Sequence, residues 1–74
     1  MNNEEITDED LRNFCRWYVG FHGTKPVAAT VLATCLCGYF STYTKEADKL
    51  LARLKQLDLV TMTHDRFLCF IVSL

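Results

Sequence analysis

The chain has 74 residues, of which 50% are hydrophobic and 12% aromatic, and its formal net charge at pH 7 is -1. A chain of this length forms one domain, which buries only about 60% of the surface that its unfolded form exposes. No apolar run approaches the roughly 18 residues that a membrane span requires, and the acidic start lacks the features of a signal peptide. We therefore expect a single cytoplasmic domain, residues 1–74, that makes no contact with a membrane.

Charge is distributed unevenly along the chain. Residues 1–10 contain five acids and no base, so all eight Lys and Arg residues lie in the remainder, where only four of the nine acids are found. This asymmetry permits binding to nucleic acid without requiring it, because a strongly basic chain would be the usual sign. We expect residues 1–7 to be an acidic, flexible N-terminus.

A first helix is predicted from Thr7 to about Phe21. Thr7 can accept a hydrogen bond from the backbone three residues later, and Asp10 can reach back to it, which is the pattern of a capping box. The helix carries a wide apolar stripe that suits packing against more than one neighbour. Its members are Leu11, Phe14, Cys15, Trp17, Tyr18, Phe21 and His22.

A second helix is predicted from Pro26 to Cys37, with Gly38 as its C-cap. The pattern is ambiguous because β-branched residues are frequent in it, so a strand remains the alternative. Thr30 and Thr34, four residues apart, form a polar stripe that favours the helix.

A third helix is predicted from Thr44 to Leu57, with Ser41 or Thr42 as its N-cap. One side is apolar at steps of three and four and should face the core; it consists of Tyr43, Ala47, Leu50, Leu51, Leu54 and Leu57. Another side carries Lys45, Lys49 and Arg53 at steps of four, with Glu46 and Asp48 beside them. This stripe is the best candidate for phosphate contact, although an ordinary solvated helix face has the same pattern.

A β-hairpin is predicted at the end of the chain, with strands at 59–63 and 67–73 around a turn at 64–66. The second strand is apolar on both faces, which predicts hydrophobic surface that is covered by self-association. The residues expected at that interface are Phe67, Leu68, Phe70, Val72 and Leu74. The alternative is that the first helix covers the second face of this strand.

The order of these elements resembles the winged helix-turn-helix domains of small prokaryotic and phage transcription regulators. The segment Leu50-Leu-Ala-Arg-Leu-Lys-Gln-Leu-Asp-Leu-Val60 is similar to the end of that family's third helix and the start of its wing. The family usually has glycine where this chain has Asp58, a residue type that can also adopt the left-handed conformation. The resemblance implies a mainly α fold with a small β-hairpin: three helices followed by a two-stranded antiparallel wing.

The resemblance also implies a function and a set of site residues. The function is that of a sequence-specific transcriptional regulator that binds double-stranded DNA as a dimer. The resemblance and the spacing of the cations on the third helix together give the expected DNA-binding residues. They are Thr42, Thr44, Lys45, Asp48, Lys49 and Arg53 on the third helix and at its N-cap, and His64 and Arg66 at the wing tip. Tyr43 belongs either to this set or to the core.

An alternative function is a winged-helix module that binds another protein, as an adaptor or inhibitor, and does not bind DNA. An unobstructed positive patch formed by Lys45, Lys49, Arg53 and Arg66 would favour DNA binding. Pairing of these cations with Glu46, Asp48 or Asp65 would favour the interaction module.

The four cysteines and two histidines do not form a recognisable metal motif. Cys35 and Cys37 are separated by one residue, no C-x-x-C pair exists, and every cysteine lies in an apolar run. Buried, reduced thiols are therefore favoured over a zinc or iron-sulfur site. The chain also has no glycine-rich phosphate loop or serine nucleophile motif, so we expect no enzyme activity, metal or cofactor.

Overall fold

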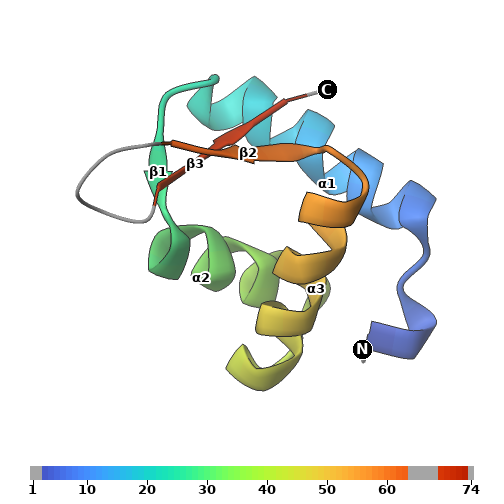
Figure 1. Ribbon diagram of the computed structural model, residues 1–74. Coiled ribbons are helices and arrows are strands. Elements are labelled where there is room, and N and C mark those ends of the chain that lie inside the picture. The colour runs from blue at the N-terminus through green and yellow to red at the C-terminus, as the bar shows by residue number, and fades with distance from the viewer. Residues whose placement is uncertain (1–2, 64–68, 74) are drawn as a thin grey trace.

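The computed structural model describes residues 3–63 and 69–73. In chain order the elements are η1 (Asn3–Glu5), α1 (Asp8–His22), β1 (Val27–Ala28), α2 (Ala29–Phe40), α3 (Thr44–Gln56), β2 (Val60–Met62) and β3 (Cys69–Val72), as Figure 1 shows. The structure confirms the prediction of a mainly helical fold with a small antiparallel sheet. Within the described ranges, none of the helices has the length and apolar character needed to cross a bilayer.

The sheet has three strands in the order β1-β3-β2, so the prediction of a two-stranded wing was wrong. In addition to its hairpin partner β2, strand β3 pairs antiparallel with β1, where Val27 lies opposite Phe70 and Ala28 opposite Cys69. Figure 1 shows the strands crossing above α2 and α3. Residues 27–28 lie within the predicted second helix, for which a strand was the alternative, and this alternative holds for these two residues alone.

Helix α1 begins as predicted. The Asp10 carboxylate accepts a hydrogen bond from the Thr7 backbone at 3.0 Å, and the Thr7 hydroxyl accepts one from the Asp10 backbone at 3.1 Å. The buried face is narrower than the apolar stripe in the sequence, because Trp17, Phe21 and His22 are exposed. The members that reach the core are Leu11, Phe14, Cys15 and Tyr18.

Helix α2 differs from its prediction at both ends. It starts at Ala29 because the two preceding residues pair with β3, and it continues through Gly38 to Phe40. Its C-cap is Ser41, whose φ of 51° is in the left-handed region. The predicted threonine stripe is present, with the Thr34 hydroxyl donating to the Thr30 carbonyl at 2.9 Å.

Helix α3 has its predicted buried side, formed by Ala47, Leu50, Leu51 and Leu54. Its N-cap is Tyr43, which makes no capping hydrogen bond with its side chain, so neither Ser41 nor Thr42 caps this helix. The Tyr43 side chain is 82% exposed and does not belong to the core. The buried side of α3 therefore begins at Ala47 and does not include Tyr43.

The core lies between the sheet and the three helices. It contains two residues, Phe70 and Val72, that were predicted to lie on an exposed association surface. Phe70 and Val72 are 2% and 0% exposed, so the chain itself covers them. Helix α1 also packs against β3. Phe67, Leu68 and Leu74, the other residues expected at that surface, lie outside the described residues.

The N-terminal segment is anchored from residue 3 onward, in contrast to the predicted flexible residues 1–7. It forms η1, which packs against α3, and the Ile6 side chain is buried in the core. Its acidic composition indicates a solvated tail, but the buried Ile6 side chain and the hydrogen bond from Arg53 to the Ile6 carbonyl attach it to the core and to α3.

The left-handed turn after α3 provides a test of this fold. Asp58 has a φ of 58°, and in this conformation the Leu59 N–H donates to the Leu54 carbonyl at 3.0 Å. Glycine adopts this conformation without a steric penalty, so Asp58→Gly should raise the free energy of unfolding by about 0.5 kcal/mol in a urea titration, whereas Asp58→Val should lower it by about 1 kcal/mol. Ala52→Gly on the exposed side of α3 is the control, with an expected loss of about 1 kcal/mol. An equal loss for Asp58→Gly would contradict the left-handed assignment.

Candidate nucleic-acid interface on helix α3

The first two turns of α3 bring together four of the predicted DNA-binding residues. Thr44, Lys45, Asp48 and Lys49 are all exposed. They can be presented to a ligand because the opposite side of the helix is held in the core by Ala47, Leu50 and Leu54. The positive end of the helix dipole adds to the two lysines at this end of α3.

Thr42, which was predicted to contact DNA, does not present its side chain at this surface. Thr42 directs its hydroxyl oxygen into the protein, where the atom is buried without a hydrogen-bond partner, while its backbone N–H donates to the Cys37 carbonyl at 3.0 Å. Its side chain is therefore not presented for base contact. His64 and Arg66, the predicted residues of the wing tip, lie outside the described residues.

Arg53 holds the N-terminal segment against α3. Its Nη1 donates to the Ile6 carbonyl at 2.6 Å, and its Nη2 lies 2.8 Å from Asp8 Oδ1. The guanidinium plane matches such a two-acceptor arrangement, which a lysine could not satisfy in the same way. Asp8 therefore neutralises Arg53, one of the three cations of α3 that were predicted to contact phosphate.

The remaining cations of α3 differ in their surroundings. Lys49 Nζ lies 3.6 Å from Glu46 Oε1 on the preceding turn. Lys55 Nζ lies 5.3 Å from the centre of the Phe70 ring. Among the ion pairs of the described residues, none includes Lys45. The N-terminal end of α3 thus carries two lysines, Lys45 and Lys49, together with two acids, Glu46 and Asp48.

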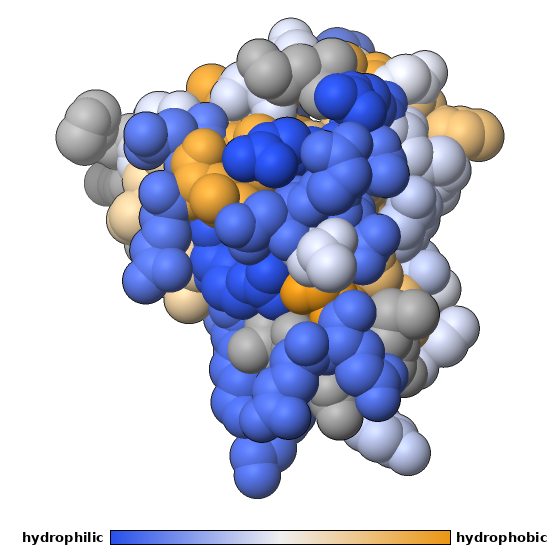
Figure 2. Space-filling view, turned by 90° about the vertical axis from the view of Figure 1, so that its right-hand side faces the viewer, coloured by the Kyte–Doolittle hydropathy of each residue, from blue (hydrophilic) through white to orange (hydrophobic). Residues whose placement is uncertain are grey.

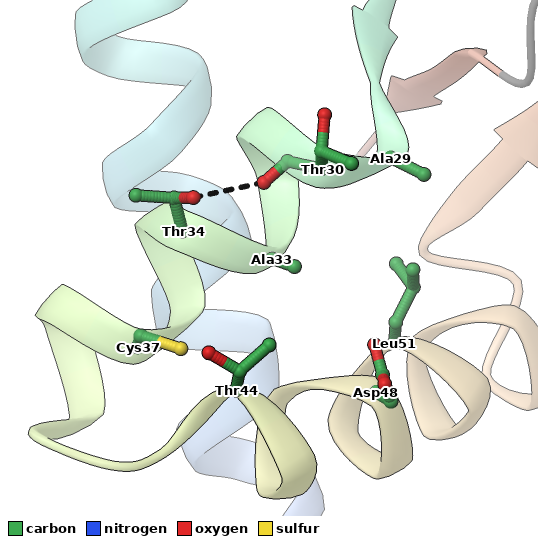
Figure 3. Close-up of a pocket in the computed structure, with 8 residues that line it drawn as sticks. All are labelled: Ala29, Thr30, Ala33, Thr34, Cys37, Thr44, Asp48 and Leu51. Carbon is green, nitrogen blue, oxygen red and sulfur yellow. Dashed lines mark hydrogen bonds between the residues drawn. The ribbon is translucent and has the colours of Figure 1, made fainter.

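A groove of about 280 Å³ separates the exposed sides of α2 and α3. Figure 3 shows that the Leu51 side chain projects from α3 toward α2 and that the side chains of Cys37 and Thr44 face each other. The α2 side is formed by small residues, namely Ala29, Thr30, Ala33, Thr34 and Cys37. The groove was not predicted, although the spacing of these small side chains at steps of three and four is visible in the sequence.

The cysteines of the described side chains are free thiols. Cys15 is buried, and desolvation raises the pKa of its thiol to about 11, whereas Cys35 and Cys37 are half-buried. Within the described part of the chain, no three His, Cys, Asp or Glu side chains are arranged to hold a metal ion.

An exposed aromatic cluster lies on α1 and the end of α2. We call Trp17, Phe21 and Tyr39 the aromatic patch; they are 37%, 74% and 39% exposed. The Trp17 ring centre is 5.4 Å from that of Phe21 and 5.1 Å from that of Tyr39. By contrast, the face in Figure 2, on the right-hand side of Figure 1 where η1 lies, is largely hydrophilic.

A double-mutant cycle tests the role of Arg53. Arg53→Gln and Asp8→Asn should show a coupling energy of about 0.5–1 kcal/mol in the free energy of unfolding, and this coupling should weaken as salt is added. The control cycle uses Lys49→Gln and Glu46→Gln, whose 3.6 Å ion pair should give a smaller coupling. Equal coupling energies in the two cycles would contradict the role of Arg53 in holding the N-terminal segment against α3.

Thiol labelling tests the packing of α1. At pH 8 an alkylating reagent should label Cys35 and Cys37 well before Cys15, because a pKa of about 11 leaves few thiolates at Cys15 and burial blocks access. Mass spectrometry of the labelled peptides reports each rate, and the same reaction in denaturant should remove the difference. Equal labelling in the folded protein would contradict the burial of Cys15.

In comparisons with known proteins, the chain matches no family model, no curated protein and no solved structure.

Proposed function

We propose that the chain is a winged helix-turn-helix domain that binds double-stranded DNA through α3 and acts as a dimer. The observation that carries this proposal is the position of α3. It packs against α2 along its apolar side, is followed directly by the β2-β3 hairpin, and leaves Thr44, Lys45, Asp48 and Lys49 exposed. A helix presented in this way can enter the major groove of DNA, which is about 12 Å wide.

The exposed residues divide into two roles in this proposal. Lys45 and Lys49 neutralise phosphates, and the N-terminal end of the helix adds a favourable dipole. Thr44 can exchange a hydrogen bond with a base edge, and the Asp48 carboxylate can accept one from a cytosine amino group. Arg53 supports this surface indirectly, since it fixes the N-terminal segment beside α3.

The number of cations limits the affinity of a single copy. Because Arg53 is held by Asp8, the phosphate contacts that remain on α3 are about two per chain, from Lys45 and Lys49, and Lys49 must exchange its ion pair with Glu46 for a phosphate. Specific DNA binding therefore requires two copies on one duplex, each with one α3 in the groove.

A protein-interaction module is the second candidate. It is favoured by the Lys49–Glu46 and Arg53–Asp8 pairs, which interrupt the positive stripe, and by the exposed aromatic patch. In that case α3 would make no contact with nucleic acid, and the aromatic patch would carry the binding.

A salt titration on mixed-sequence duplex DNA tests the proposal. Wild type should bind at low salt, with log K falling linearly against log salt. The double variant Lys45→Ala, Lys49→Ala should bind more weakly, and its slope should be shallower by about 1.8 per chain, because two phosphate contacts are lost. Fluorescence anisotropy of a labelled duplex measures both quantities.

The matched control removes two cations outside α3, with Arg12→Ala and Arg16→Ala in one chain; both side chains lie beside Glu9 on the exposed side of α1. This variant should keep most of the wild-type slope. Absence of binding by folded wild type at low salt, or equal losses in the two double variants, would overturn the assignment of α3 and favour the interaction module.

A further inference from the structure

The aromatic patch continues into a surface hollow on the same face of α1. Asp10, Tyr39, Phe40 and Ser41 line this hollow, and Tyr39 is shared with the patch. Asp10 and Trp17 are seven residues apart on α1, which is close to two helical turns, so both lie on one side of the helix. The same side therefore carries a protruding side chain, Phe21, at one end and the hollow at the other.

This arrangement is self-complementary under a two-fold rotation. Asp10 and Phe21 are separated by eleven residues of a continuous helix, or about 16 Å along its axis. A second α1 placed antiparallel, with the axis near the midpoint of that segment, brings each Phe21 to the level of the other copy's hollow. A two-fold interface requires that one surface fit itself, and this surface has both parts.

The charges of the two ends favour the antiparallel orientation. The end of α1 at the hollow is acidic: Glu4, Glu5, Asp8, Glu9 and Asp10 outnumber the nearby cations Arg12, Arg16 and Arg53. The end at Phe21 carries Lys25, and no acid occurs between residues 11 and 45. Antiparallel pairing brings unlike ends together, whereas parallel pairing would place the acidic ends side by side.

The size of the face also suits a second copy. A stable interface covers about 800 Å² of each partner, which is roughly a sixth of the 4866 Å² exposed by this chain. A helix of 15 residues is about 22 Å long, and the adjoining end of α2 extends the face. Exposed Trp and Tyr side chains, such as Trp17 and Tyr39 on this face, are typical of the residues that dominate binding energy.

We propose that two copies of this chain pair through antiparallel α1 helices, with Phe21 of each copy inserted beside Tyr39 of the other. The proposal specifies the dimer in the proposed function and rests on that part of it, but not on DNA binding. It replaces the predicted association through β3, whose residues Phe70 and Val72 are buried in the core.

Sedimentation velocity without DNA tests the pairing. Wild type should sediment as a dimer at micromolar concentrations, and Phe21→Glu should raise the dissociation constant at least about hundredfold, since two phenyl contacts worth tenfold or more each are lost. Phe21 is exposed within one chain, so the variant should keep the wild-type circular dichroism spectrum, which shows that it remains folded. Tyr43→Glu, which changes another exposed aromatic residue outside the patch, is the control and should remain dimeric.

Cross-linking tests the orientation. Glu9→Cys and His22→Cys are made in separate chains, and mixtures are treated with a short thiol cross-linker beside wild type, which measures the background from native cysteines. Antiparallel pairing predicts a cross-link in the mixture above that of either variant alone. A monomeric wild type, a dimer unaffected by Phe21→Glu, or cross-linking of His22→Cys only to itself would overturn the proposal. Loss of DNA binding with an intact dimer would instead refute only the role of α3.

Discussion

The central position of β3 in the sheet determines which surfaces of this protein remain exposed. Pairing with β1 on one edge and β2 on the other joins the middle of the chain to its C-terminal part. It also buries Phe70 and Val72 and sets the start of α2 at Ala29. Because α2 begins there, its small residues face α3 across the groove, and its last turn brings Tyr39 and Phe40 against Phe14 of α1. The aromatic patch and the α3 surface both follow from this pairing.

The two surfaces have different chemistry and lie on different elements. On α3, a few cations and hydroxyl groups are exposed while a leucine-rich side is buried, and one potential phosphate ligand, Arg53, is used to fasten the N-terminal segment. On α1, aromatic rings extend from the buried Phe14 out to the exposed Phe21. In the proposed function the two surfaces complement each other, since pairing through α1 would double the number of phosphate contacts that α3 can make on one duplex.

Features encoded by neighbouring residues could be predicted from the sequence, and features that depend on distant contacts could not. The capping box of α1 involves residues three apart, and the buried side of α3 follows from a regular apolar period. Strand β1 has two residues and exists only because β3 lies beside it. The Arg53–Asp8 pair joins residues 45 positions apart, and no local pattern signals it.

Gly38 was expected to end α2, but the packing of Phe40 in the core extends the helix past it, at a cost of about 1 kcal/mol for an interior glycine. The same long-range packing leaves Trp17 and Phe21 exposed, although both belong to the apolar stripe of the first helix in the sequence.

The most direct test of this account is a titration of isotope-labelled protein with a mixed-sequence duplex at low salt, followed by two-dimensional proton–nitrogen NMR. The account predicts that the backbone signals of Thr44, Lys45, Asp48 and Lys49 shift progressively with DNA. Signals of Trp17 and Phe21 should instead depend on protein concentration before DNA is added. A titration in which the α3 signals stay fixed while other surfaces respond would contradict the central claim that α3 is the DNA-binding element.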